Sequence, residues 1–331
     1  QAHRPTNLEA LFPNSALKSI NLGKSDILVM PEPCSIHQWH LAEDARRNGA
    51  KIAVIVYDLL PITHPQYFTD EQLAAYQAYI KQITTLGDIF ICISQTTRDA
   101  FEAYMQLPPH TNPSKPRPIG YFPLGAKLDL WNGKEKASQA GLNDRLMEVF
   151  SGYSTYLAVG TIEPRKNHMY LLDAFNTLWS ARLPVKLCLV AGRIGWHRDS
   201  IMERIESHPR FGTDLFLFRN VTDAELAFCY RNARALLFAS HAEGLGLPII
   251  EALYFGAPVL ASDIPIHREA GQGRCTYFSL DDSADLSSKI MEIEQGAHGV
   301  PRPDCREEAE TLIDWRTSSE MFLREIKLRM G

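Results

Sequence analysis

The sequence predicts an α/β protein of two domains, each a parallel sheet covered by helices on both faces. Short apolar runs rich in β-branched residues recur along the chain, and segments with helical periodicity separate them. Strands that alternate with helices in this way build parallel sheets. The length of 331 residues is sufficient for two domains of ordinary size, each with its own core.

The first domain is expected over residues 1–135. Its predicted strands are 26–30, 51–57 and 88–94, followed by a helix over 95–106. The proline-rich stretch 107–118 is expected to be a loop, because proline lacks an amide hydrogen and restricts the backbone.

The second domain is expected over residues 152–312, after a polar boundary region between about 125 and 152. Leu171, Phe175 and Leu178 recur at helical spacing and predict a helix near 167–182 with one apolar face. The predicted strands are 155–160, 185–192, 214–220, 235–240 and 257–262. A last helix over 313–330 has an apolar side and must pack on one of the two domains.

Composition excludes several classes of protein. The chain is 45% hydrophobic and 22% charged, and no run approaches the ~18 apolar residues of a membrane span. A formal net charge of −5 argues against nucleic acid as a partner. The 6 cysteines are widely spaced, which indicates reduced thiols in the cytoplasm. Because Gln1 is not an initiator methionine, we expect the chain to be part of a longer protein.

The segment from Glu243 to Glu251 carries the strongest functional signal. Gly244 and Gly246 follow a predicted buried strand and precede a predicted helix. Bare backbone at a helix N-terminus binds anions, and two flanking carboxylates can accept hydrogen bonds from sugar hydroxyls. The pattern therefore suits a ligand with both phosphates and hydroxyls, although glutamates near a helix start also serve as helix caps.

A second candidate anion site follows the first strand of the second domain. Gly160 and Thr161 begin a loop that contains Arg165 and Lys166 and leads into a helix. Such loops lie outside the carboxyl ends of parallel strands, where α/β proteins bind phosphates. The two cations could neutralise a diphosphate, or they could be ordinary surface charges.

Other kinds of site are disfavoured. The sequence contains no Asp-x-Asp, no HExxH and no paired Cys/His spacing, so we expect no metal. The Gly244-Leu-Gly246 turn does not complete the GxGxxG of a dinucleotide site, and no GxxxxGK[ST] of a P-loop is present.

The Glu-(seven residues)-Glu segment 243–251, with the following stretch 257–269, resembles the retaining glycosyltransferases of family 4, the glycosyl transferases group 1. The resemblance implies the GT-B fold, in which two Rossmann-like domains face each other across a cleft and a C-terminal helix, here 313–331, crosses back. It implies that Glu243 contacts the donor hexose and that Glu251 contacts the ribose of the nucleotide.

The loop that begins at Gly160 is similar to the diphosphate-binding loop of that family. Lys166 fits the family spacing, whereas Thr161 stands where arginine is usual and Arg165 takes its place. Further donor contacts are expected from the backbone of Gly244, Leu245, Gly246 and Leu247, from Val221 near the base, and from Arg193. A plain helix cap explains the Val221 loop equally well, and Arg193 could be a solvated surface charge.

The stretch 57–65 of the first domain resembles the His-Asp-Leu-x-Pro segment of bacterial polysaccharide mannosyltransferases, with Tyr57 in place of the usual histidine. Asp58 is therefore a catalytic candidate on the acceptor side. His64 and Ser94 are further acceptor-side candidates, with a loop residue and a helix cap as their alternatives.

The resemblance implies a metal-independent hexosyltransferase that moves mannose from GDP-mannose, with retention, to a glycan or lipid-linked acceptor. A cytoplasmic protein with peripheral contact to the inner face of a membrane is expected. Two alternatives remain: a nucleotide-sugar 2-epimerase on the same fold, and a catalytically idle nucleotide- or glycan-binding module. The second is favoured by Tyr57 and by a short first domain without the early glycine-rich turn.

Overall fold

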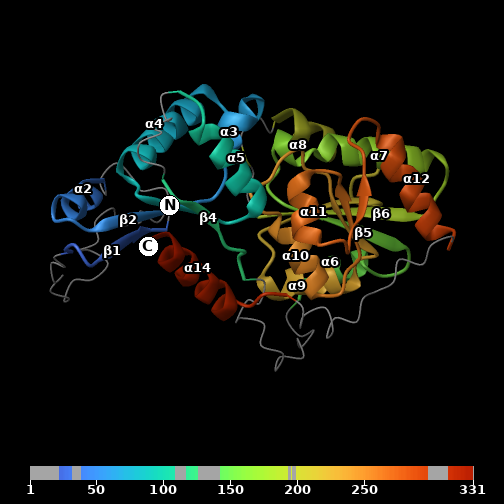
Figure 1. Cartoon of the computed structure of the whole chain (residues 1–331). Helices are drawn as coiled ribbons and strands as arrows, with labels where there is room; N and C mark the ends of the chain where they lie inside the picture. The colour runs from blue at the N-terminus through green and yellow to red at the C-terminus, as the bar shows by residue number, and fades with distance from the viewer. Residues whose placement is uncertain are drawn as a thin grey trace, which may run out of the picture.

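Two parallel sheets, each covered by helices, lie side by side in the computed structural model (Figure 1). This arrangement confirms the predicted fold class. The structure describes residues 22–31, 39–108, 117–125, 142–192, 195, 199–296 and 312–330.

The first sheet has four strands in the order β1-β2-β3-β4, and every neighbouring pair is parallel. The strands are β1 Ile27–Met30, β2 Lys51–Val56, β3 Ile89–Cys92 and β4 Ile119–Tyr121. The first three were predicted. Strand β4 was missed because only three residues remain after the prolines, too few for a visible alternation.

Helices from the first half of the chain pack on one face of this sheet. They are α2 Trp39–Arg47, α3 Leu60–Thr63, α4 Asp70–Leu86 and α5 Gln95–Met105. The short helix η2 Pro65–Tyr67 links α3 to α4. Thr69 and Gln72 form a capping box that fixes the start of α4. Phe101 of α5 and Phe90 of β3 are both fully buried and pack with ring centroids 4.9 Å apart.

The second sheet has six parallel strands in the order β10-β9-β8-β5-β6-β7. They are β5 Ser154–Val159, β6 Val185–Ala191, β7 Leu215–Arg219, β8 Ala235–Phe238, β9 Val259–Ser262 and β10 Thr276–Phe278. Strand β10 was not predicted, because its three residues include exposed Thr276 and carry no apolar run. The order reverses between β5 and β8, and ligands of open α/β sheets bind at such a switch point.

Helices cover both faces of the second sheet (Figure 1). They are α6 Asp144–Val149, η4 Pro164–Lys166, α7 His168–Ser180, α8 Asp199–Glu206, α9 Asp223–Asn232, α10 Leu247–Tyr254, α11 Pro265–Gly271 and α12 Ser283–Glu294. One apolar core joins the strands to α7, α8 and α12, and another joins them to α6, α9 and α10. The predicted boundary region 125–152 thus contains a helix of the second domain's core, α6.

The last helix, α14 Trp315–Met330, packs on the first sheet although it follows the second domain in sequence (Figure 1). Phe322 meets Phe122 with ring centroids 5.0 Å apart, and Ile326 is buried in the same cluster. Ser318 Oγ also donates to the Pro123 carbonyl at 2.7 Å. The chain therefore crosses back, as the family resemblance implied.

Candidate active site

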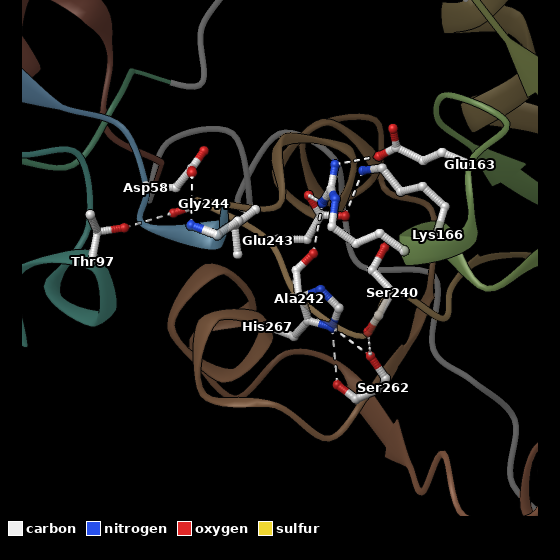
Figure 2. A network of polar contacts seen from close by, with 12 residues as sticks. Asp58, Thr97, Glu163, Lys166, Ser240, Ala242, Glu243, Gly244, Ser262 and His267 are labelled. Carbon is white, nitrogen blue, oxygen red and sulfur yellow. Dashed lines mark hydrogen bonds and ion pairs between the residues drawn. The ribbon is translucent and has the colours of Figure 1, made fainter. Parts of the chain in front are cut away.

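Four charged side chains form a compact cluster after strands β5 and β8 (Figure 2). Glu243 accepts from Lys166 Nζ at 2.5 Å and from Arg165 Nη1 at 2.7 Å. Arg165 Nη2 donates to Glu163 Oε1 at 2.5 Å. The Glu243, Lys166 and Arg165 side chains are 9%, 13% and 15% exposed, so their charges attract one another with little screening by water.

Local backbone structure brings the cluster together. The short helix η4 places Arg165 and Lys166 just after β5, and the Ala242 carbonyl accepts from Arg165 Nη1 at 2.7 Å. The His241 amide in turn donates to the Arg165 carbonyl at 2.9 Å. The loop after β8 is therefore held against the loop after β5, because the two strands are neighbours in the sheet.

The cluster holds Glu243 ionised. Burial favours its protonated form, but Lys166 and Arg165 lower the pKa of the Glu243 carboxyl below its ordinary value. With Glu163 the cluster contains two carboxylates and two cations, so it is formally neutral when all four groups are charged. An anion that bound at this cluster would lie next to the cations of Arg165 and Lys166.

Glu251 has different surroundings. It lies in the second turn of α10, is partly buried, and accepts a 2.7 Å hydrogen bond from the Tyr230 hydroxyl. Tyr230 itself is fully buried. Burial raises the pKa of the Glu251 carboxyl, and the tyrosine hydrogen bond offsets only part of that effect. The tyrosine fixes the orientation of this carboxyl.

The Gly-Leu-Gly turn lies against the first domain. Gly246 adopts φ +88° at the N-cap of α10, a left-handed conformation that favours glycine. A Cβ on Gly244 would lie 3.0 Å from the Tyr57 carbonyl oxygen, so this close approach also favours glycine. The Leu245 side chain is buried in a cluster with Ile93, Phe122 and other apolar residues of the first domain. Figure 2 shows Asp58 and Thr97 facing Gly244.

A pocket of about 260 Å³ lies between the two domains. Asp58, His64, His241 and Glu243 supply its titratable groups. Its other lining residues are Leu59, Leu60, Thr63, Thr96, Thr97, Ala100, Ala242, Ile264, Pro265 and Ile266. An apolar wall opposite a few polar groups is typical of small-molecule sites.

Burial shifts the pKa values of the other three titratable groups of the pocket, Asp58, His64 and His241. It raises the pKa of Asp58, although the Leu60 amide, which donates at 3.0 Å, and nearby Arg165 act in the opposite direction. Burial and Arg165 lower the pKa of His64, and burial and His64 lower the pKa of His241. Both histidines therefore favour their neutral forms, in which a ring nitrogen can accept a hydrogen bond.

Some of the other residues named from the sequence lie beside the charged cluster or the turn at Gly244, and others lie elsewhere. Gly160 is beside Lys166, since a Cβ on it would lie 3.4 Å from Lys166 Cε. Ser94 is the N-cap of α5, as its alternative interpretation held, and its hydroxyl is also 3.1 Å from the Gly244 carbonyl. Val221 packs at the edge of the second domain's core, and Thr222 caps α9. Thr161 is half-buried after β5, Leu247 is exposed, and Arg193 lies outside the described residues.

Sequence reasoning missed three residues of the site. Glu163 stands within the Glu-Pro-Arg-Lys segment but received no role, because its partner Arg165 is revealed only by the fold. Tyr67 and His241 stack with ring centroids 5.3 Å apart although they come from different domains. His241 lies two positions before Glu243, and that proximity was its one sequence signal.

No group of three or more His, Cys, Asp or Glu side chains suited to a metal ion occurs in the part of the chain that the structure describes. Among the helices it describes, none combines the length and apolarity needed to span a bilayer.

The paired sheets, the crossing helix and the site between them define the GT-B class of glycosyltransferase fold. An α,α-trehalose 6-phosphate synthase from Burkholderia multivorans shares it with a TM-score of 0.66 at 14% identity, over 91% of this chain and 70% of that one. A sucrose-phosphate synthase from Thermosynechococcus elongatus gives a TM-score of 0.65 at 19% identity, over 91% and 73% of the two chains.

Residues 148–308 match the family of the glycosyl transferases group 1. The serotype-specific mannosyltransferase WbdA of Escherichia coli is 31% identical over 294 residues, 86% of this chain and 35% of WbdA. The O-antigen chain mannosyltransferase B of Escherichia coli is 38% identical over 35% of this chain and 30% of its own length. The chain thus spans about a third of the length of these curated relatives.

Proposed function

We propose that this chain is a retaining hexosyltransferase that moves mannose from GDP-mannose to a glycan or lipid-linked acceptor in polysaccharide biosynthesis, without a metal ion. The observation that carries the proposal is the buried cluster of Glu243, Lys166 and Arg165 beside the turn that opens α10. The names of the WbdA and O-antigen relatives support mannose and polysaccharide synthesis.

Lys166, Arg165 and the N-terminus of α10 would stabilise the leaving diphosphate. Their cationic groups and backbone amides suit a charge that grows as the bond to the sugar breaks. Since Glu243 now binds both cations, donor entry would require its carboxylate to exchange at least one of them for hydroxyls of the hexose. Glu251, oriented by Tyr230, would accept from the ribose hydroxyls.

The acceptor would lie in the pocket between the domains, near Asp58 and His64. Its hydroxyl oxygen forms a bond to C1 of the hexose while the bond from C1 to the diphosphate oxygen breaks. The hydroxyl proton passes to the departing phosphate oxygen. Attack on the face from which the diphosphate leaves retains the anomeric configuration and needs no protein nucleophile. Asp58 would orient the acceptor.

Calorimetric titration of the intact chain with GDP, UDP, GDP-mannose and UDP-glucose, without and with Mg²⁺, tests this proposal. We expect tightest binding of the guanine nucleotides, unchanged by Mg²⁺ and strongly weakened in Lys166→Ala. Failure of the folded protein to bind any nucleotide would contradict the proposal.

Product analysis separates the alternatives. Transfer to an added mannan oligosaccharide supports the transferase. Inversion at C2 of the donor, or release of nucleotide that needs no acceptor, would indicate the epimerase. Binding without either reaction would indicate an idle module.

A further inference from the structure

Helix α5 of the first domain has its N-terminus at the domain interface. The first amides of a helix have no partner within it, and an anion there is favoured by the helix dipole. Ser94 caps the Thr97 amide at 3.0 Å, but the first turn of α5 contains no acidic residue of its own. The amides of Gln95 and Thr96 therefore need an acceptor from elsewhere.

Glu269, on α11 of the second domain, supplies that acceptor. Its Oε1 accepts from the Gln95 amide at 2.6 Å. Its Oε2 accepts from the Thr96 amide at 2.8 Å and from the Thr96 hydroxyl at 2.6 Å. One carboxylate thus makes three charge-assisted hydrogen bonds across the domain interface, and such bonds are stronger than neutral ones.

The same end of α5 also holds the turn at Gly244. The hydroxyls of Ser94 and Thr97 lie 3.1 and 3.3 Å from the Gly244 carbonyl oxygen. Gly244 directly follows Glu243, and the next residue, Leu245, is buried in the first domain's cluster. A displacement of the α5 start would therefore displace the residue next to the charged cluster.

Glu269 also joins two walls of the interdomain pocket. Thr96, Thr97 and Ala100 of α5 form one wall, and Ile264, Pro265 and Ile266 form another. Glu269 lies one turn beyond Ile266 on the same helix, so its hydrogen bonds to α5 fix the distance between the walls.

We propose that Glu269 is a positioning residue that sets the width of the acceptor pocket and couples the pocket to the donor-side turn at Gly244. The inference rests on the proposed function for its ligands, an acceptor saccharide and a nucleotide sugar. Its structural part stands on the hydrogen bonds of Glu269 to α5 and on those of the Ser94 and Thr97 hydroxyls to Gly244.

Hydrogen–deuterium exchange of the free 331-residue chain tests the structural part. In Glu269→Ala we expect exchange over 94–98 and over 242–247 to become roughly tenfold faster, because three charge-assisted bonds are lost. The isosteric Glu269→Gln should change both segments in the same direction but less. Asp263→Asn is the matched control, since it removes an exposed carboxylate near α11 that pairs with Arg268 and does not contact α5. Unchanged exchange over 242–247 in Glu269→Ala would overturn the coupling.

Kinetics test the functional part. With saturating donor, Glu269→Ala should raise the acceptor KM by roughly tenfold, while kcat changes by about twofold at most. Glu269→Gln should raise the acceptor KM by a smaller factor. An unchanged acceptor KM in an active Glu269→Ala enzyme would overturn the role in the pocket. If the wild-type chain neither binds nucleotide nor transfers sugar, the proposed function fails, and the exchange data alone then decide whether Glu269 holds the interface.

Discussion

Glu243 and Glu251 lie eight residues apart at the two ends of one motif, yet their surroundings are opposite. Glu243 binds two cations, which lower the pKa of its carboxyl, whereas Glu251 accepts from a buried tyrosine and has a raised pKa. Two residues of the same type thus differ in charge partners and in the direction of their pKa shifts, because their surroundings differ. The proposed function assigns them different ligands on this basis: the hexose for Glu243 and the ribose for Glu251.

The largest expected effect is on folding stability. Glu243→Ala leaves Lys166 and Arg165 buried without their shared carboxylate, which should cost about 3–5 kcal/mol in the free energy of unfolding. Glu251→Ala leaves only the Tyr230 hydroxyl without its acceptor and should cost about 1–3 kcal/mol. Urea denaturation of both variants measures the difference. Equal losses would remove the contrast between the two glutamates.

The next expected effect is on turnover. Lys166→Ala should lower kcat by about 100- to 1000-fold, because a preorganised charge beside the leaving diphosphate is lost. Lys289→Ala is the matched control, since its ammonium pairs with Asp285 on the surface of α12, away from the cluster. Steady-state kinetics at saturating donor compare the two. Wild-type turnover in folded Lys166→Ala protein would exclude that role.

A smaller effect is expected where Tyr230 orients Glu251. Tyr230→Phe should raise the donor KM about fivefold with kcat nearly unchanged, the result of losing one neutral-to-ion hydrogen bond in binding. Tyr156→Phe breaks a comparable 2.8 Å tyrosine–glutamate bond to Glu294 on α12 and should leave the donor KM unaltered. A similar rise in both variants would mean that the effect comes from stability.

The smallest expected effect is on the pH dependence of the free energy of unfolding. Because the pKa of Glu243 is lowered in the folded state, its contribution is present above the unfolded value of about 4.3 and is lost as pH falls through the folded pKa. Because the pKa of Glu251 is raised, ionising it costs stability as pH rises above about 4.3.

The two glutamine variants should therefore diverge from wild type in opposite directions. The deficit of Glu243→Gln should shrink as pH falls below about 4.3, whereas the stability of Glu251→Gln relative to wild type should rise as pH increases above it. Unfolding curves between pH 3 and 7 measure both trends. Parallel curves would contradict the assigned pKa shifts.

The sequence was most informative where a local pattern was long. The apolar runs that became β2, β5, β6 and β8 were visible because each buries most of its side chains. Strands β4 and β10 have three residues each and show no usable pattern, so only pairing with a neighbouring strand reveals them.

The residues of the candidate site also divide into those that a local motif indicates and those that only the fold reveals. Glu243, Lys166, Arg165 and Glu251 were named from motifs with fixed spacing, and the first three meet in one cluster. Glu163, His241 and Glu269 were not assigned, because their significance lies in partners that no local pattern indicates. Glu269, for example, contacts residues 173 and 174 positions away.

By itself the sequence determined the fold class, the family resemblance and the residue types of the donor motifs. The periodic spacing of apolar residues and the short glycine-containing turns are local patterns, so they can be recognised in the sequence. Only the tertiary structure decided that Glu243 binds two cations, that Leu245 enters the first domain's core and that Glu269 caps α5. Burial and distance set those ionic and hydrogen-bonding partners, and both quantities exist only after residues distant in sequence have been brought together.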